Sequence, residues 1–273
     1  MFLIQFSLPA NAQHTSGYAP VNGLDMYYEI HGEGTPLVLI HGSFMTIDGW
    51  GDLLPELAKN HRVIALEMQG HGHTADIDRP YSYTAMADDI AKALTYLKVE
   101  KADILGYSFG GSIAFEFAIK HPGLVNRLVI VSSVYKHEGW LPQVRNALKG
   151  FNETIFDGTP MKTAYEKVAP DKAHWHAFIK KMMQFDNQPF DLGADNIKNI
   201  KVPTLLLMGD NDGVDLNHTI ETYRLLGGGI FADMEGLPKV QLAIHPGKGH
   251  VALVEDTRKM METLEPFLNA VKK

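Results

Sequence analysis

The sequence predicts an α/β protein with a doubly wound, mostly parallel sheet and an inserted helical cap. Three observations lead to this prediction. Short apolar runs rich in β-branched residues alternate with helix-like runs from about residue 24 onward. The runs at 37–40 and 128–131 are continuously apolar, as in parallel strands that are buried on both faces. Between Ser133 and Pro203 no segment resembles a strand, which predicts helices inserted between two strands.

The predicted elements follow one another in a regular order. Seven segments have the length and composition of strands, at 26–30, 37–40, 63–67, 102–106, 128–131, 204–208 and 240–244. Helices are expected at 50–59, 83–97, 112–120, 216–226 and 251–271, with Thr84 as a candidate N-cap of the second. In the strandless interval, helix-like pieces at 141–149, 161–168 and 174–185 are punctuated by prolines. Such alternation predicts right-handed crossovers between neighbouring parallel strands.

These elements predict two structural units and an N-terminal segment. Residues 23–133 and 203–273 form the predicted core, and residues 134–202 form a cap over the carboxyl edge of the sheet, where such folds bind ligands. Residues 1–22 are either a tail or a signal peptide, because Ala10-Asn11-Ala12 resembles a cleavage site after Ala12. A signal peptide predicts a secreted or periplasmic protein, and an uncleaved tail predicts a cytoplasmic one. No later apolar run approaches transmembrane length.

Composition excludes several classes of protein. The chain has 273 residues, a net charge of −7 and no cysteine. A cysteine nucleophile, a disulfide framework and a thiolate metal site are therefore excluded. No basic stripe indicates a nucleic-acid partner. The sequence gives no indication of the oligomeric state.

One short segment carries the strongest chemical signal. Gly106-Tyr107-Ser108-Phe109-Gly110 lies between a predicted strand and a predicted helix. A serine with glycines two residues before and after it, on a strand-to-helix turn, is typical of a nucleophile elbow. The glycines leave room for strand and helix to approach each other. The pattern predicts Ser108 as a nucleophile.

A serine nucleophile needs a base, and the base needs an orienting acid. His250 follows the last predicted strand, directly after Gly249. Asp210 and Asp212 both follow the strand predicted at 204–208. The order serine, acid, histidine is the one expected for an elbow fold, and it leaves both aspartates open as the acid.

Several motifs occur together in one order: His41-Gly42-Ser43-Phe44, a glycine-rich turn at 69–74, the elbow, the turn at 209–212, and Gly249-His250. In this combination the chain resembles the α/β-hydrolase family, in its cap-bearing branch of small serine esterases and cofactor-free haloperoxidases. The resemblance extends from about Gly23 to the end of the chain. It implies hydrolase activity without a cofactor.

The resemblance also implies roles for individual residues. The family's acid usually stands three residues after the glycine, which favours Asp212 and leaves Asp210 as a turn residue. The backbone amides of Ser43 and Phe109 would form the oxyanion hole, with Phe44 next in line. His41 would hold the oxyanion loop. Relatives that displace halide or open epoxides use a carboxylate nucleophile at the elbow, so a serine disfavours those reactions.

The substrate pocket is expected between the elbow and the cap. Six aromatic or sulfur-containing residues are predicted to line it: Phe44, Tyr107, Trp140, Trp175, Phe178 and Met182. No metal is expected, because the histidine pairs at 71 and 73 and at 174 and 176 lack a third ligand at diagnostic spacing.

The sequence predicts hydrolysis of a small ester through an acyl-enzyme on Ser108, with His250 as base and Asp212 as acid. Hydrolysis of a C–C bond, a lactone or an amide, and peracid formation of the haloperoxidase type, could use the same three residues. A protein of another class, a small-molecule receptor on a hydrolase scaffold, is the remaining alternative. The natural substrate is not indicated.

Overall fold

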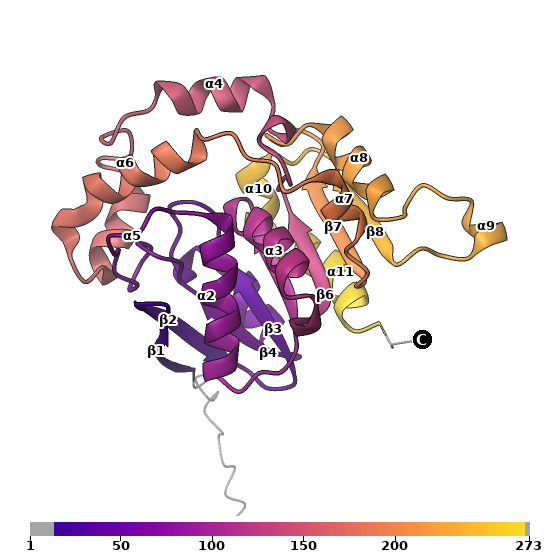
Figure 1. Cartoon of the computed structure of the whole chain (residues 1–273), viewed down its shortest axis with the longest axis horizontal. Coiled ribbons are helices and arrows are strands. Elements are labelled where there is room, and N and C mark those ends of the chain that lie inside the picture. The colour runs from indigo at the N-terminus through magenta and orange to yellow at the C-terminus, as the bar shows by residue number, and fades with distance from the viewer. Residues whose placement is uncertain (1–13, 271–273) are drawn as a thin grey trace, which may run out of the picture.

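The computed structural model describes residues 14–270, which form a central sheet with helices on both faces (Figure 1). The sheet has eight strands in the order β1-β2-β4-β3-β5-β6-β7-β8, and the predicted fold class is confirmed. The strands are β1 (Thr15–Val21), β2 (Leu24–His31), β3 (Thr35–Ile40), β4 (His61–Leu66), β5 (Ala102–Tyr107), β6 (Val125–Val131), β7 (Thr204–Gly209) and β8 (Val240–His245).

Parallel pairing dominates the sheet and explains its apolar strands. β4, β3, β5, β6, β7 and β8 run parallel, whereas β1 and β2 pair antiparallel at one edge. Along β3, Val38 and Ile40 belong to one core cluster, and Leu37 and Leu39 belong to the other. Alternate residues of the strand therefore enter opposite cores, which requires a continuously apolar run.

Each face of the sheet has its own set of helices (Figure 1). On one face, α2 (Tyr83–Tyr96) and α3 (Phe109–Lys120) pack against each other and the strands, and α8 (Leu216–Leu225) lies on the same face. On the other face lie α1 (Leu53–Leu57), α10 (His250–Glu255) and α11 (Thr257–Leu268). This arrangement brings the loops after the parallel strands to one edge.

Between β6 and β7 the chain is helical. The helices are α4 (Pro142–Gly150), α5 (Pro160–Val168), α6 (Trp175–Asp186) and α7 (Ala194–Lys198). In Figure 1, α4 and α6 run across the top of the molecule, above the sheet and α2. Lys181 on α6 donates to Asp76 at 2.7 Å and to the carbonyl of Ile77 at 3.0 Å. These contacts tie α6 to the loop after β4.

The structure contradicts one part of the N-terminal prediction. The sequence pattern places residues 14–22 in a tail, but Thr15–Val21 forms the edge strand β1. Asn22 and Gly23 both have positive φ angles, 47° and 82°, in the turn to β2. Asn-Gly is the preferred dipeptide for such a two-residue hairpin, so the signal is present in the sequence. The predicted cleavage site after Ala12 lies outside the described residues.

Helix boundaries also differ from the predictions. Ser82, not Thr84, caps α2, because its hydroxyl accepts from the N–H of Ala85 at 3.0 Å. The helix predicted at 251–271 is divided into α10 and α11 at Asp256, whose carboxylate accepts from the N–H of Lys259. Within residues 14–270, no helix combines the length and the apolar character that a membrane crossing requires.

Candidate active site

Ser108 lies on the turn between β5 and α3. Its backbone has φ 54° and ψ −121°, a conformation that non-glycine residues seldom adopt. Such a backbone costs about 1–3 kcal/mol and persists where the surrounding structure enforces it. The N–H of Ser108 donates to the carbonyl of Val131 at 2.9 Å, which anchors the strained residue to the end of β6.

The glycines around Ser108 are required by close packing. A Cβ atom on Gly106 would lie 2.2 Å from the carbonyl oxygen of Gly110. A Cβ on Gly110 would lie 2.1 Å from the carbonyl oxygen of Ile40. Real Cβ atoms essentially never approach so closely, so this tight turn depends on glycine at both positions.

Three side chains from distant parts of the chain meet at this edge of the sheet. Ser108 Oγ lies 2.9 Å from His250 Nε2, and His250 Nδ1 lies 2.8 Å from Asp212 Oδ1. His250 begins α10, directly after Gly249, and Asp212 follows β7. A carboxylate on Nδ1 favours the tautomer that carries hydrogen there, which leaves Nε2 free to accept the serine proton.

Asp212 is buried and accepts three hydrogen bonds. Besides His250, the hydroxyl of Ser132 donates to Oδ2 at 2.5 Å and the N–H of Val214 donates to Oδ1 at 3.2 Å. Burial alone would raise the pKa of Asp212. The hydrogen bond and charge of His250, together with the two other donors, outweigh burial and hold this pKa below its usual range. The carboxylate is therefore ionised at neutral pH.

Asp210 has a different environment. Its side chain is exposed, and its Oδ1 accepts from the N–H of Lys248 and from the Asn211 side chain. These contacts close the turn after β7 and do not reach His250. The geometry thus separates the two aspartates that the sequence left open.

Two buried histidines shape the loop after β3. The Nε2 of His41 accepts from the N–H of Met68 at 3.1 Å, and its Nδ1 lies 2.8 Å from the carbonyl of Gly42. Burial, with a smaller effect of His41, holds the pKa of His71 well below its usual value, so this ring is neutral. Its Nε2 accepts from the N–H of Phe44 at 3.3 Å. The amide of Phe44 is thereby occupied, which leaves the Ser43 amide as the candidate donor from this loop.

A cavity of about 460 Å³ opens above Ser108 and His250. Its wall is mainly apolar and combines the edge of the sheet with the helices of the 134–202 segment. Phe44, Tyr107 and Trp140, three of the six predicted pocket residues, line it. The other lining residues are Gly42, Ser43, Met45, Gly49, Val144, Leu148, Met161, Asp186, Gly213, Val251, Val254 and Glu255.

Trp175, Phe178 and Met182 do not line this cavity, so the prediction for these three residues is corrected. Each is at most 1% exposed and belongs to the main hydrophobic core. Phe178 stacks on Tyr165, with ring centroids 5.3 Å apart. The apolar stripe of α6 therefore packs against α5 and the core, as apolar stripes at helical spacing usually do.

Sequence reasoning missed two polar residues of the site. Ser132 supports Asp212 and has a positive φ of 49° at the end of β6. Asp186, the last residue of α6, lines the cavity. Burial raises the pKa of Asp186 to about 7, and a hydrogen bond with the Ser43 side chain only partly opposes this. Neither residue belongs to a recognisable motif.

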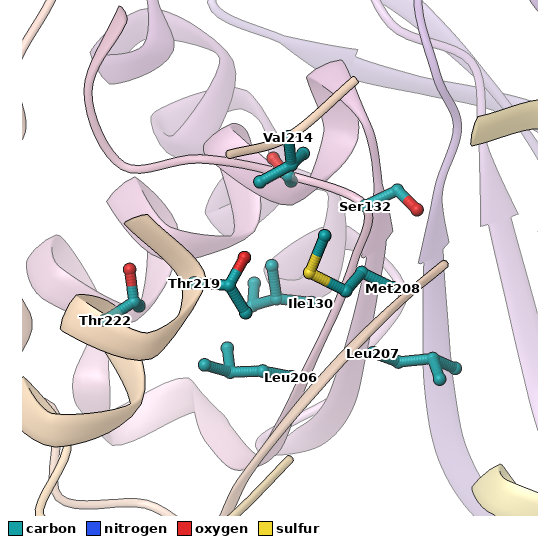
Figure 2. Close-up of a pocket in the computed structure, with 9 residues that line it drawn as sticks. Ile130, Ser132, Leu206, Leu207, Met208, Val214, Thr219 and Thr222 are labelled. Atoms are coloured by element: carbon teal, nitrogen blue, oxygen red, sulfur yellow. The ribbon is translucent and has the colours of Figure 1, made fainter. Parts of the chain in front are cut away.

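A second, much smaller cavity of about 10 Å³ lies behind Ser132, between β6, β7 and α8 (Figure 2). In Figure 2 the side chains of Ile130, Thr219 and Met208 gather on one side, and the Ser132 hydroxyl points away from them. The cavity can hold about one water molecule at most. Among the described residues, no group of three histidine or carboxylate side chains is placed to hold a metal ion.

Known proteins are similar to this chain in sequence and in fold. The sequence profile of the family described as alpha/beta hydrolase fold matches residues 35–162. The chain is 42% identical over 106 residues to a 2-hydroxymuconate semialdehyde hydrolase of a Pseudomonas species, covering 37% of this chain and 38% of that enzyme. A protein of Azorhizobium caulinodans whose name describes a carbamate hydrolase, RutD, is 30% identical over 215 residues, covering 72% of this chain and 81% of the relative.

The structural neighbours agree with these relatives. A single-residue mutant of the meta-cleavage product hydrolase CumD from Pseudomonas fluorescens IP01, complexed with acetates, superposes with a TM-score of 0.71 at 26% identity. The match covers 93% of this chain and 97% of that one. The family resemblance and the prediction of an enzyme are confirmed: the chain belongs to the α/β-hydrolase fold family and is a hydrolase.

Proposed function

We propose that the protein hydrolyses a carboxylic ester of a small molecule through an acyl-enzyme intermediate on Ser108. The observation that carries the proposal is the hydrogen-bonded line from Ser108 Oγ through the His250 ring to Asp212. A serine, a histidine and a buried carboxylate in this geometry constitute the working parts of a serine hydrolase.

The proposed reaction has two steps. Ser108 Oγ attacks the ester carbonyl, and its proton passes to His250 Nε2. The oxyanion accepts hydrogen bonds from the amides of Ser43 and Phe109. Phe109 is the first residue of α3, where the helix itself offers no acceptor for the N–H. The alcohol leaves with the proton from His250, and a water molecule activated by His250 then hydrolyses the acyl-enzyme to the acid.

Asp212 supports both steps by its charge and position. It holds the Nδ1–H tautomer of His250 and stabilises the imidazolium that forms during each proton transfer. The donors from Ser132 and Val214 fix the carboxylate in turn. In this scheme no group outside the chain takes part except substrate and water.

Hydrolysis of a C–C bond is the second candidate, because the names of two similar proteins describe a 2-hydroxymuconate semialdehyde hydrolase and a meta-cleavage product hydrolase. A muconate is a carboxylate. Among the described residues that line the cavity, none is lysine or arginine, whereas two are carboxylic acids, Asp186 and Glu255. Since a carboxylate substrate would meet like charge without a basic partner, the cavity favours an uncharged or cationic ester.

The two candidates are separated by a direct comparison of substrates. The purified protein is assayed with p-nitrophenyl butyrate and with 2-hydroxymuconate semialdehyde under the same conditions, and kcat/KM is measured for each. We expect the ester to be the better substrate by at least about tenfold. A higher kcat/KM for the semialdehyde would replace the ester proposal by C–C hydrolysis on the same residues.

A further inference from the structure

One acidic residue of the cavity has no part in the proposed chemistry. Asp186 ends α6, is partly buried, and lines the same cavity as Ser108 and His250. Its carboxyl also interacts with the side chain of Ser43, whose amide is a proposed oxyanion donor. The carboxyl group is therefore near the position at which the substrate carbonyl would bind.

The surroundings of Asp186 do not favour a negative charge. In the part of the chain that the structure describes, no ion pair involves this residue, and the cavity wall has no lysine or arginine. A carboxylate at the C-terminal end of a helix also meets the negative end of the helix dipole. The Ser43 side chain is the one stabilising contact that opposes burial, and it does not prevent a raised pKa of about 7.

Nearby groups do not neutralise the charge of Asp186. Burial, together with the negative charge of Asp186, raises the pKa of Tyr81 and of Tyr83 so far that both side chains stay neutral. Glu255 lines the same cavity and is exposed. His250 shares the wall, but its Nδ1 is engaged by Asp212. A cation that enters the cavity is thus attracted by Asp186 and meets no fixed positive side chain.

We propose that Asp186 is a substrate-binding residue that recognises a positively charged group, so that the substrate class is an ester carrying an amine or a quaternary ammonium. A polar group retained at such a cost inside an apolar cavity is a functional candidate when a ligand can supply its missing partner. Trp140 and Tyr107 line the same cavity and supply aromatic rings of the kind that attract the methyl groups of such a cation.

This inference rests on the proposed ester hydrolysis. An ionised Asp186 attracts a cation, and a protonated one does not. With a pKa of about 7, the free enzyme has roughly a tenth of Asp186 ionised at pH 6 and roughly nine tenths at pH 8. Preference for a cationic ester therefore rises with pH across this interval. Because both esters of a pair are hydrolysed by the same residues, any other effect of pH on the chemistry cancels in the ratio of their kcat/KM values.

The experiment compares esters that differ only in charge. The alcohol-side pair is 2-(trimethylammonio)ethyl butyrate and 3,3-dimethylbutyl butyrate, in which a carbon replaces the nitrogen. The acyl-side pair is methyl 6-(trimethylammonio)hexanoate and methyl 7,7-dimethyloctanoate. For at least one pair we expect the cationic ester to have a roughly tenfold higher kcat/KM at pH 8, as one partly desolvated charge pair would give, and a smaller advantage at pH 6.

Asp186→Asn tests the residue itself, since the amide can still accept from the Ser43 hydroxyl but carries no charge. In this variant the ratio of kcat/KM for the cationic ester to kcat/KM for the uncharged ester should be about one and should not depend on pH. Glu255→Gln is the matched control, because it removes an acid that water screens, and it should change the ratio by less than about twofold. An unchanged ratio in Asp186→Asn, or no cationic preference in either pair, would overturn the inference.

A binding measurement separates this inference from the proposed function. Calorimetry with the Ser108→Ala protein measures the affinity of the same four esters without turnover. Tighter binding of a cationic ester that is lost in the Ser108→Ala, Asp186→Asn double variant supports the recognition role, even if the unmodified enzyme hydrolyses none of them. In that event the ester proposal fails and the binding site stands. Equal affinities within each pair would reject the binding site whatever the enzyme hydrolyses.

Discussion

The two walls of the cavity are built on different principles. On the wall formed by the loops after the strands, the side chains of Ser108, His250 and Asp212 have partners within the protein: Asp212 has three donors, and His250 bonds at both ring nitrogens. The wall formed by α4, α5 and α6 is apolar except for Asp186, whose interaction with Ser43 leaves its pKa raised. The residues proposed to perform the chemistry are held in place by hydrogen bonds within the protein. Asp186, proposed to recognise the substrate, gains its ionic partner only when the substrate binds.

The largest effect should come from the serine. Ser108→Ala removes the nucleophile but keeps the turn, and we expect kcat for p-nitrophenyl butyrate to fall by at least about 10⁴-fold. Circular dichroism and the unfolding temperature should show a folded protein, since alanine fits the space of the serine side chain. Near-normal turnover by this variant would show that another residue is the nucleophile.

The two aspartates after β7 provide the next test. Asp212→Asn leaves an amide beside His250 Nδ1 and favours the wrong tautomer, so kcat should fall by about 10³–10⁴-fold. Asp210→Asn is the matched control, because it makes the same chemical change in the same turn at an exposed position that does not contact His250. It should change kcat by less than about threefold. Equal losses in the two variants would contradict the assignment of Asp212.

Substitution of Ser132 tests whether its hydrogen bond to Asp212 contributes to catalysis. Its hydroxyl donates to Asp212 Oδ2, and a hydrogen bond to a charged group is worth about 1.5–3 kcal/mol. Ser132→Ala should lower kcat about tenfold or more and leave KM unchanged, because the hydroxyl acts through Asp212 and not on the substrate.

Ser132→Gly separates the hydroxyl from the backbone. Ser132 has a φ of 49°, which glycine adopts without strain. If the hydrogen bond is what matters, the glycine variant loses as much activity as the alanine variant while keeping its thermal stability. Full activity in the glycine variant would assign the effect to the backbone and remove Ser132 from the mechanism.

The smallest effect concerns stability on the helical wall. The pKa of Asp186 is raised in the folded protein, so between about pH 4 and pH 7 the folded state binds a proton that the unfolded state has released. The resulting loss of stability is absent at low pH and complete above pH 7. Asp186→Asn should raise the unfolding temperature by a few degrees at pH 8 and by less at pH 5. A lower unfolding temperature at pH 8 would show that the carboxylate stabilises the fold.

The wall built from the strands could be predicted largely from the sequence. Ser108, Asp212 and His250 each follow a strand and have glycine close by, because tight turns at the carboxyl edge require particular residues. Parallel strands bring their carboxyl ends to one edge, so motifs far apart in the sequence converge. For the same reason Phe44 and Tyr107, next to these turns, lie at the cavity as the sequence predicts.

The helical wall could not be predicted in this way. An apolar helix residue such as Phe178 can face the core or the cavity, and only the packing of α5, α6 and the core decides between them. Asp186 at a helix end looks like an ordinary surface acid in the sequence. The edge strand β1 escapes prediction for a different reason: only Ala19 and Val21 are buried along it, so its apolar pattern is weak.

The proposed mechanism requires a covalent acyl-enzyme on Ser108. Its most direct test is to mix the protein with p-nitrophenyl butyrate, quench in acid within the first turnovers, and locate the butyryl group by peptide mass spectrometry. We expect a single butyryl ester on Ser108, formed together with a burst of p-nitrophenol and absent from the Ser108→Ala protein. Steady hydrolysis with no acyl adduct on Ser108, or with the adduct on another residue, would contradict it.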